Sequence, residues 1–115
     1  MRVYILDLPC RSREQIVSWL SEDCRVSEVK AFEDYIRLIE QAESSPPDIC
    51  IIRLGSDGIP GLKAAEMLGQ IGAGIRIVFI SGKKDYALDA YEAGAYGYLL
   101  CPVNRDKLQK YLTIN

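Results

Sequence analysis

The chain has 115 residues, of which 49% are hydrophobic and 26% are charged, and its formal net charge is -2. This composition is that of a globular domain with one substantial core, and it lacks the basic stripe with which proteins bind nucleic acid. No run approaches the roughly 20 apolar residues of a membrane helix, and the apolar run near Met1 is too short for a signal-peptide core, so we expect a cytoplasmic protein.

The reactive side chains of the chain are few. Histidine is absent, which excludes Ser-His-Asp and Cys-His catalysis and removes the commonest metal ligand. The four cysteines lack the spacing of a metal site. We therefore predict no metal and no cofactor, and we expect reduced thiols that pack as small hydrophobic groups. The cysteines are Cys10, Cys24, Cys50 and Cys101.

The first part of the chain alternates short apolar runs with amphipathic segments. The first apolar run ends at Asp7. Ser12 and Gln15 have the spacing of a capping box, which favours a helix that begins there. Apolar residues at helical spacing indicate a second helix before the Ser-Ser-Pro-Pro break. The predicted elements are strands at 3–6 and 25–29 and helices at 12–21 and 31–42.

In the second part of the chain, polar residues interrupt the apolar runs less often. The run 49–52 is apolar at every position and 75–80 is apolar except for Arg76, which is typical of strands covered on both faces in a parallel sheet. Gly94 is placed to end a helix, and Asn104 is placed to cap the last one. The predicted elements are strands at 49–52, 75–80 and 96–100 and helices at 60–71, 85–93 and from 104 onward.

Strands thus alternate with helices along the whole chain. This order predicts a doubly wound α/β fold with a parallel sheet. In such folds, sites form outside the carboxyl ends of the strands. Candidate site residues are therefore expected at 7–10, 53–57, 81–84 and 101–102.

Two segments at these places resemble the receiver domain of two-component response regulators. Residues 86–103 (YALDAYEAGAYGYLLCPV) are similar to the fourth helix and fifth strand of receivers attached to LytTR-type DNA-binding domains, and 47–53 with 58–62 are similar to the third strand and its loop. The resemblance implies a flavodoxin-like (βα)5 domain over 1–115 with sheet order 2-1-3-4-5. It also implies that this domain is the N-terminal part of a longer regulator, so that DNA is contacted only through an output domain.

The resemblance also defines a phosphorylation pocket and shows where this chain departs from it. Receivers carry an acidic pair after the first strand, an aspartate acceptor at the end of the third, Ser or Thr after the fourth, and a lysine before a proline. Here Asp7 keeps one acid and Ser81 keeps the hydroxyl. Leu8 replaces the second acid, Arg53 the acceptor and Cys101 the lysine.

These changes remove the chemistry of phosphoryl transfer. One carboxylate facing a permanent guanidinium cannot attract Mg²⁺ as several acids do, and arginine is not a nucleophile. Asp57 is a poor substitute because aspartate before glycine is common turn chemistry. We therefore expect a non-enzymatic pseudo-receiver in which Arg53 pairs with Asp7. In the alternative, Arg53 does not pair and binds a small anion or metabolite, which makes the domain a ligand sensor.

Four tyrosines and one proline complete the expected site. The resemblance places Tyr98 at the aromatic switch position and implies a cis peptide bond before Pro102. Tyrosines are enriched at protein interfaces. We therefore expect a homodimer through the fourth helix, fifth strand and fifth helix, with packing of the rings into the core as the other interpretation. The remaining tyrosines on this face are Tyr86, Tyr91 and Tyr96.

Overall fold

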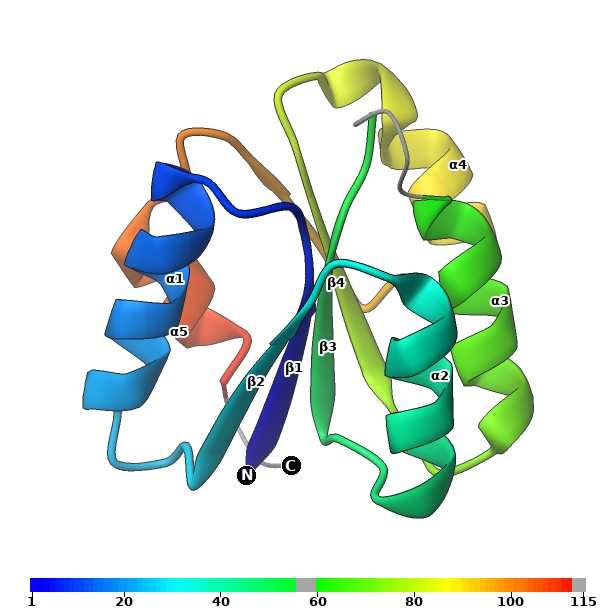
Figure 1. The fold of residues 1–115 in the computed structure, drawn as a ribbon. Helices are drawn as coiled ribbons and strands as arrows, with labels where there is room; N and C mark the ends of the chain where they lie inside the picture. Colours follow the sequence, from blue (N-terminus) through cyan, green and yellow to red (C-terminus); the bar gives the residue numbers. More distant parts are fainter. Residues whose placement is uncertain (56–59, 113–115) are drawn as a thin grey trace.

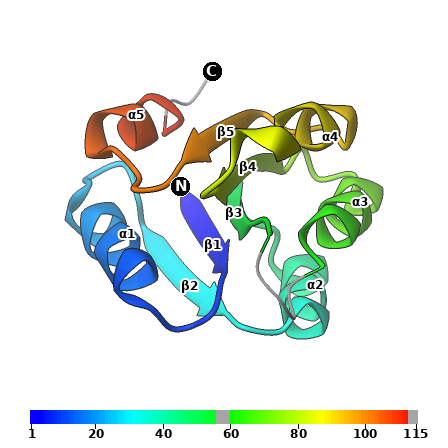
Figure 2. The same cartoon turned by 90° about the horizontal axis from the view of Figure 1, so that it is seen from above.

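The computed structural model describes residues 1–55 and 60–112, which form one parallel sheet between two layers of helices (Figure 1). The strand order β2-β1-β3-β4-β5 confirms the predicted doubly wound, flavodoxin-like fold. Helices α1 and α5 cover one face of the sheet, and α2, α3 and α4 cover the other (Figure 2). The strands are β1 (Arg2–Leu6), β2 (Glu28–Phe32), β3 (Ile49–Arg53), β4 (Arg76–Ser81) and β5 (Gly97–Leu100), and the helices are α1 (Arg11–Glu22), α2 (Tyr35–Ser44), α3 (Gly61–Ile71), α4 (Ala87–Glu92) and α5 (Arg105–Lys110).

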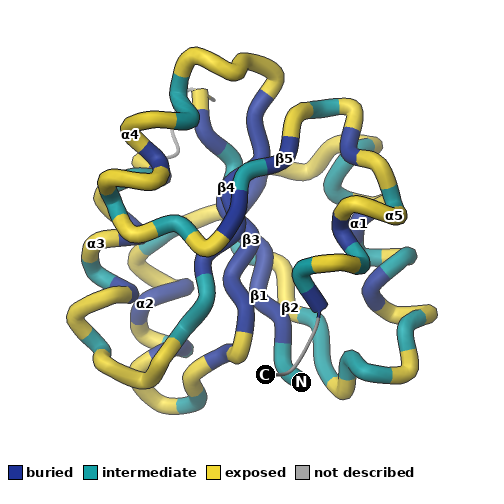
Figure 3. Tube along the Cα trace, turned by 180° about the vertical axis from the view of Figure 1, so that it is seen from behind, coloured by how far each residue is buried: buried dark blue, intermediate teal, exposed yellow. Residues whose placement is uncertain are grey.

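Alternate residues of each strand supply two separate hydrophobic cores. Successive side chains of a strand point to opposite faces of the sheet. In β1, Val3 and Ile5 pack under the α1/α5 layer, whereas Tyr4 and Leu6 pack under the α2–α4 layer. Figure 3 shows the consequence as a buried central sheet whose covering helices are exposed on their outer sides.

The second strand and second helix begin later along the chain than predicted. β2 starts at Glu28, where a strand at 25–29 was expected, and Phe32 belongs to this strand and not to a helix. Its register is set by parallel pairing with β1 from Arg2 to Leu6, a contact between distant parts of the chain. The next helix then begins after Asp34, whose carboxylate accepts a hydrogen bond from the Ile36 amide at 2.9 Å.

Helix ends are capped partly by residues that the sequence pattern did not indicate. The N-cap of α1 is Cys10, whose sulfur accepts a hydrogen bond from the Arg13 amide at 3.4 Å. The capping-box prediction for Ser12 was therefore wrong, because Ser12 lies inside the helix. Asn104 caps α5 as predicted, with its side-chain oxygen 3.2 Å from the Lys107 amide nitrogen.

The segment around α4 is shorter than predicted. A 3₁₀ turn (Lys84–Tyr86) precedes α4, so the expected helix at 85–93 is split in two. Gly94 follows with φ 93°, a left-handed conformation that favours glycine. The fifth strand starts at Gly97, and Tyr96 lies just before it.

The four thiols are in different surroundings, and all are reduced. Cys50 is fully buried, and desolvation raises the pKa of its thiol. Cys101 is partly exposed and packs against the core under α1 and α5, whereas Cys10 and Cys24 are exposed, so the expected packing as small hydrophobic groups holds for Cys50 and in part for Cys101. In the described part of the chain, no helix is long and apolar enough to cross a membrane.

An aspartate at the end of α1 makes the stability of this region depend on pH. Hydrogen bonds from the Arg25 side chain and backbone lower the pKa of Asp23 from 3.8 to about 2. Because the pKa is lower in the folded state, the stabilisation is present above pH 3.8 and is lost as the pH falls through about 2. Asp23→Asn should therefore lower the free energy of unfolding near pH 6 by up to about 1 kcal/mol.

Urea denaturation of Asp23→Asn and of the wild-type chain at a series of pH values measures this effect. We expect the difference between the two proteins to shrink between pH 4 and pH 2. A difference that stays constant across that range contradicts the assignment.

Candidate functional site

Three side chains meet at the carboxyl edge of the sheet, at the top of Figure 1. Asp7 follows β1, Arg53 ends β3 and Cys101 follows β5. By strand alternation, Arg53 shares its face with Ile49 and Ile51, which pack under the α1/α5 layer. The site is therefore built on the face that α1 and α5 cover.

The expected ion pair between Arg53 and Asp7 is present. The Arg53 atoms Nε and Nη2 both donate to Oδ2 of Asp7, at 3.2 and 3.0 Å. The other carboxylate oxygen, Oδ1, accepts from the Leu8 amide at 2.8 Å. Asp7 is only 2% exposed and the Arg53 side chain 15%, so most of the pair is shielded from water.

The rest of the Arg53 guanidinium contacts two residues outside the ion pair. Its Nη2 donates to the Ser12 hydroxyl of α1 at 3.3 Å, and its Nη1 donates to the Cys101 sulfur at 2.9 Å. Burial alone lowers the pKa of Arg53, but hydrogen bonding and charge from Asp7 and Cys101 together outweigh burial and raise it. A permanently charged guanidinium thus connects β1, β3, α1 and the segment after β5.

Two further residues contact Asp7: Cys10, which lies in the range 7–10 where site residues were expected, and Arg13, which lies outside it. Arg13 donates from Nη1 to the Asp7 backbone carbonyl at 3.3 Å, and the Cys10 thiol donates to Asp7 Oδ2 at 3.8 Å. Both belong to the start of α1, which packs against the end of β1. Their positions just after a site strand were a usable signal, but nothing in their spacing assigned them to Asp7.

Leu8 and Ser81, the other members of the expected pocket, are not part of this hydrogen-bonded cluster. The Leu8 side chain is 39% exposed, and only its backbone amide contacts Asp7. Ser81 is buried and its hydroxyl accepts from the Lys83 amide at 3.1 Å. By alternation Ser81 lies on the same face as Phe79, under the α2–α4 layer. The structure therefore separates Ser81 from Arg53.

The aromatic residues of the fourth helix and fifth strand have different surroundings. The Tyr98 hydroxyl donates to the Lys83 carbonyl, and Tyr86 packs against the core under the α2–α4 layer. Tyr96 is in edge-to-face contact with Tyr111, with ring centroids 5.8 Å apart. Tyr91 is 52% exposed, which leaves it available at the surface.

The segment after β5 turns sharply. The peptide bond between Cys101 and Pro102 is cis. The turn places the Cys101 sulfur beside Arg53 and the start of α5 beside α1.

The residues at this edge do not fit a magnesium ion. Mg²⁺ prefers several oxygen ligands with net negative charge. Both carboxylate oxygens of Asp7 already accept hydrogen bonds. Oδ1 accepts from the Leu8 amide, and Oδ2 accepts two hydrogen bonds from the Arg53 guanidinium. Within residues 1–55 and 60–112 no group of three potential metal-ligating side chains occurs. Asp57, weighed above as a substitute acceptor, lies outside the described residues.

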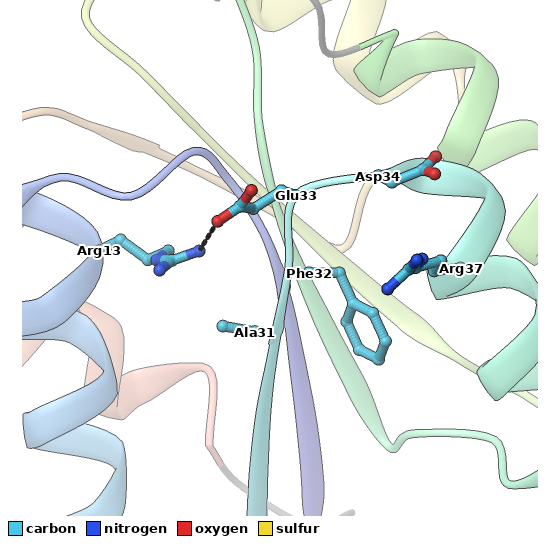
Figure 4. A pocket seen from close by; sticks show the side chains of 6 residues that line it. All are labelled: Arg13, Ala31, Phe32, Glu33, Asp34 and Arg37. Carbon is cyan, nitrogen blue, oxygen red and sulfur yellow. Dashed lines mark ion pairs between the residues drawn. The ribbon is translucent and has the colours of Figure 1, made fainter.

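One hollow lies away from Arg53, at the end of β2 (Figure 4). It has a volume of about 700 Å³, and an ion pair between Arg13 and Glu33, 3.8 Å apart, spans its mouth. Asp34 and Arg37 lie on its other side (Figure 4). The positive charges of Arg13 and Arg37 balance the negative charges of Glu33 and Asp34, so this hollow has no preference for a charged ligand. A second hollow, of about 510 Å³, lies over Asp7 and Arg53 themselves.

The fold and the polar cluster together define a doubly wound α/β module with its site at the carboxyl edge of the sheet. Residues 4–113 match the sequence model of a protein family, the response regulator receiver domain. The chain belongs to this family of non-enzymatic signalling modules.

Relatives of the chain include regulators of transcription. It is 30% identical over 113 residues to an uncharacterized response regulatory protein of Yersinia pestis, covering 98% of this chain and 47% of the relative. It is 29% identical over 114 residues to the transcriptional regulatory protein BtsR of Escherichia coli, covering 97% and 46%. The chain thus spans about half the length of the curated relatives it matches.

Solved structures support the same fold. The response regulatory domain of the protein mrkE of Klebsiella pneumoniae has a TM-score of 0.82 and 24% sequence identity to this chain. The alignment covers 97% of this chain and 92% of that domain. At this identity the likeness establishes the receiver fold.

Proposed function

We propose that the chain is a pseudo-receiver, a receiver domain that regulates transcription without being phosphorylated at the usual position. The observation that carries the proposal is the Arg53 guanidinium at the end of β3, bound to Asp7. Arginine has no nucleophilic oxygen to accept a phosphoryl group. The same guanidinium supplies the positive charge that Mg²⁺ supplies when bound to an acidic pocket, so the carboxyl edge is neutralised without a metal.

Treatment with a phosphoryl donor tests this proposal directly. After incubation with Mg²⁺ and acetyl phosphate, we expect the intact mass of the chain to stay unchanged, because Arg53 occupies the acceptor position and the Asp7 carboxylate is engaged by it. Beryllofluoride should cause no NMR shift at the amides of Leu8 or Ser81. An active receiver domain treated in parallel, which must gain one phosphoryl group, is the control. A stoichiometric, base-labile adduct overturns the proposal, and peptide mapping then decides whether Asp57 carries it.

The partner surface of the pseudo-receiver is proposed to be the face made by α4, β5 and α5, acting as a homodimer interface. Three large apolar side chains are exposed there, Leu88 at 70%, Tyr91 at 52% and Leu100 at 49%. Burying such side chains between two copies stabilises the dimer by roughly 25 cal/mol for each Å² of apolar surface that is removed from water.

Sedimentation of a charged variant tests the interface. Leu88→Glu should shift the chain from dimer to monomer, because it places a carboxylate in the centre of the apolar contact. The matched control is Ile36→Glu, which changes an equally apolar residue, 52% exposed, on α2. Equal weakening by both variants, or a wild-type chain that is monomeric at millimolar concentration, contradicts the assignment.

The output of the regulator is proposed to be a LytTR-type DNA-binding domain in the part of the protein beyond this chain. Support comes from the resemblance of residues 86–103 and from relatives about twice as long as this chain. The cytoplasmic location expected from the sequence stays a prediction of the same kind.

The alternative function, a sensor that binds an anion through Arg53 at the strand ends, has less support. It requires a guanidinium that is available to a ligand. Four hydrogen bonds to Asp7, Ser12 and Cys101 already engage all three nitrogens of Arg53. An anion in the hollow over Asp7 would also meet that buried carboxylate.

A further inference from the structure

A third hollow lies on the other side of Arg53, between α1 and the segment that joins β5 to α5. Its volume is about 450 Å³, within the range of about 300–1,000 Å³ that is usual for small-molecule sites. Arg53 and Cys101 are among the residues that line it. This α1/α5 pocket, named for its place between α1 and the segment 101–103 that leads into α5, is distinct from the hollow over Asp7, although Arg53 contributes to both.

The walls of the α1/α5 pocket are mostly apolar. Ile16 and Trp19 come from α1, on the side that faces the sheet, and Val103 comes from the segment before α5. Ile16 and Trp19 are three positions apart, so they lie on one face of the helix, one turn from each other. An elongated apolar group fits along this face.

The charge of the pocket lining has one sign. Two arginines, Arg11 and Arg53, line the pocket and no carboxylate does. The charge of Arg53 is compensated by Asp7 from the opposite side. The Arg11 side chain makes no hydrogen bond or ion pair with any residue in 1–55 or 60–112, so its guanidinium is available at the pocket.

We propose that the α1/α5 pocket binds a short aliphatic carboxylate. The carboxylate pairs with the Arg11 guanidinium, and the aliphatic chain lies against Ile16, Trp19 and Val103. A neutral ligand leaves Arg11 without a partner, and a ligand without an apolar chain leaves the walls in contact with water. Apolar walls with one available cation therefore select an amphipathic anion.

This site extends the proposed function, because it offers a way to signal that needs no phosphoryl group. A ligand in the pocket contacts Cys101 and Arg53, and Arg53 in turn holds Asp7. Binding there is coupled to the carboxyl edge through one side chain. The test of binding below does not depend on whether the chain is phosphorylated.

The chain contains a single tryptophan, and it lies in this pocket, so intrinsic fluorescence reports occupancy. Titration with hexanoate should give a saturable change in Trp19 emission. Hexanamide has the same chain without the charge and should bind roughly tenfold more weakly, because it cannot pair with Arg11. In Arg11→Gln the two ligands should bind equally weakly. The matched control Arg105→Gln, which removes an exposed arginine of α5 that pairs with Glu22, should keep the preference for hexanoate.

Protection of a thiol gives a second, independent measurement. Bound hexanoate should slow alkylation of Cys101 by iodoacetamide, followed by peptide mass spectrometry, without slowing alkylation of the exposed Cys24. The proposal is overturned by the absence of a saturable change up to about 10 mM hexanoate. It is equally overturned by equal binding of acid and amide to the wild-type chain, or by equal protection of both cysteines.

Discussion

Replacing Arg53 by methionine should lower the free energy of unfolding by about 3–5 kcal/mol. Methionine keeps much of the volume but removes the charge, so the Asp7 carboxylate, only 2% exposed, loses its counter-ion. The Leu8 amide and the weak Cys10 donor are all that remain on its oxygens. Urea denaturation at pH 7, analysed as a two-state transition, measures the loss.

A double-mutant cycle separates the stranded charge from lost packing. Adding Asp7→Ala to Arg53→Met should restore much of the stability, because the buried carboxylate is then gone. The control is Arg105→Ala, which breaks an exposed ion pair with Glu22 and should cost less than about 1 kcal/mol. If Arg53→Met is as stable as the wild-type chain, then the Arg53 guanidinium of the wild-type chain is exposed to solvent and its ion pair with Asp7 does not stabilise the site.

Restoring the receiver residues at three positions together should create a phosphoryl acceptor at the end of β3. In the triple variant Leu8→Asp, Arg53→Asp and Cys101→Lys, three carboxylates and one ammonium meet at the carboxyl edge. Such a set attracts Mg²⁺ and provides a nucleophile. We expect intact mass to change from no adduct to a phosphoryl adduct on most chains after treatment with Mg²⁺ and acetyl phosphate.

The single variants Arg53→Asp and Cys101→Lys show whether the charge of the site determines Mg²⁺ binding and phosphorylation. Arg53→Asp alone should be strongly destabilised in metal-free buffer, because two carboxylates then share a buried site, and Mg²⁺ should recover part of that stability. Cys101→Lys alone should gain no adduct. A folded triple variant that is stabilised by Mg²⁺ but never phosphorylated shows that the loss of function extends beyond these three positions.

Most of the fold was predictable because its signals are local. Continuous apolar runs such as 49–52 and 77–80 occur where strands are covered on both faces, and their alternation with helices leads to a parallel sheet. The placement of Asp7 and Arg53 at one edge follows from the same argument. Their ion pair was accessible from sequence because opposite charges on neighbouring strand ends lie within reach.

The parts that were not predicted depend on contacts between distant residues. β2 is an edge strand, and its register comes from pairing with β1 and not from its own weak pattern. The contacts of Arg53 with Ser12 and Cys101 depend on where α1 packs and how the chain turns at Pro102. Cys10 as a helix cap was missed because cysteine is an uncommon capping residue.

The alternation of side chains along the strands has a consequence for how the two halves of the site communicate. Arg53 and Cys101 contact the α1/α5 layer, whereas Ser81 and Tyr98 lie on the side of α4, where both form hydrogen bonds with the backbone of Lys83. The side chains of the two groups therefore lie on opposite faces of the sheet, while the backbone joins them, since the Cys101 amide donates to the Ser81 carbonyl at 2.8 Å. The Arg53 side chain contacts α1 through Ser12 and the segment before α5 through Cys101, so a change at Arg53 acts first on the α1/α5 layer of the regulator.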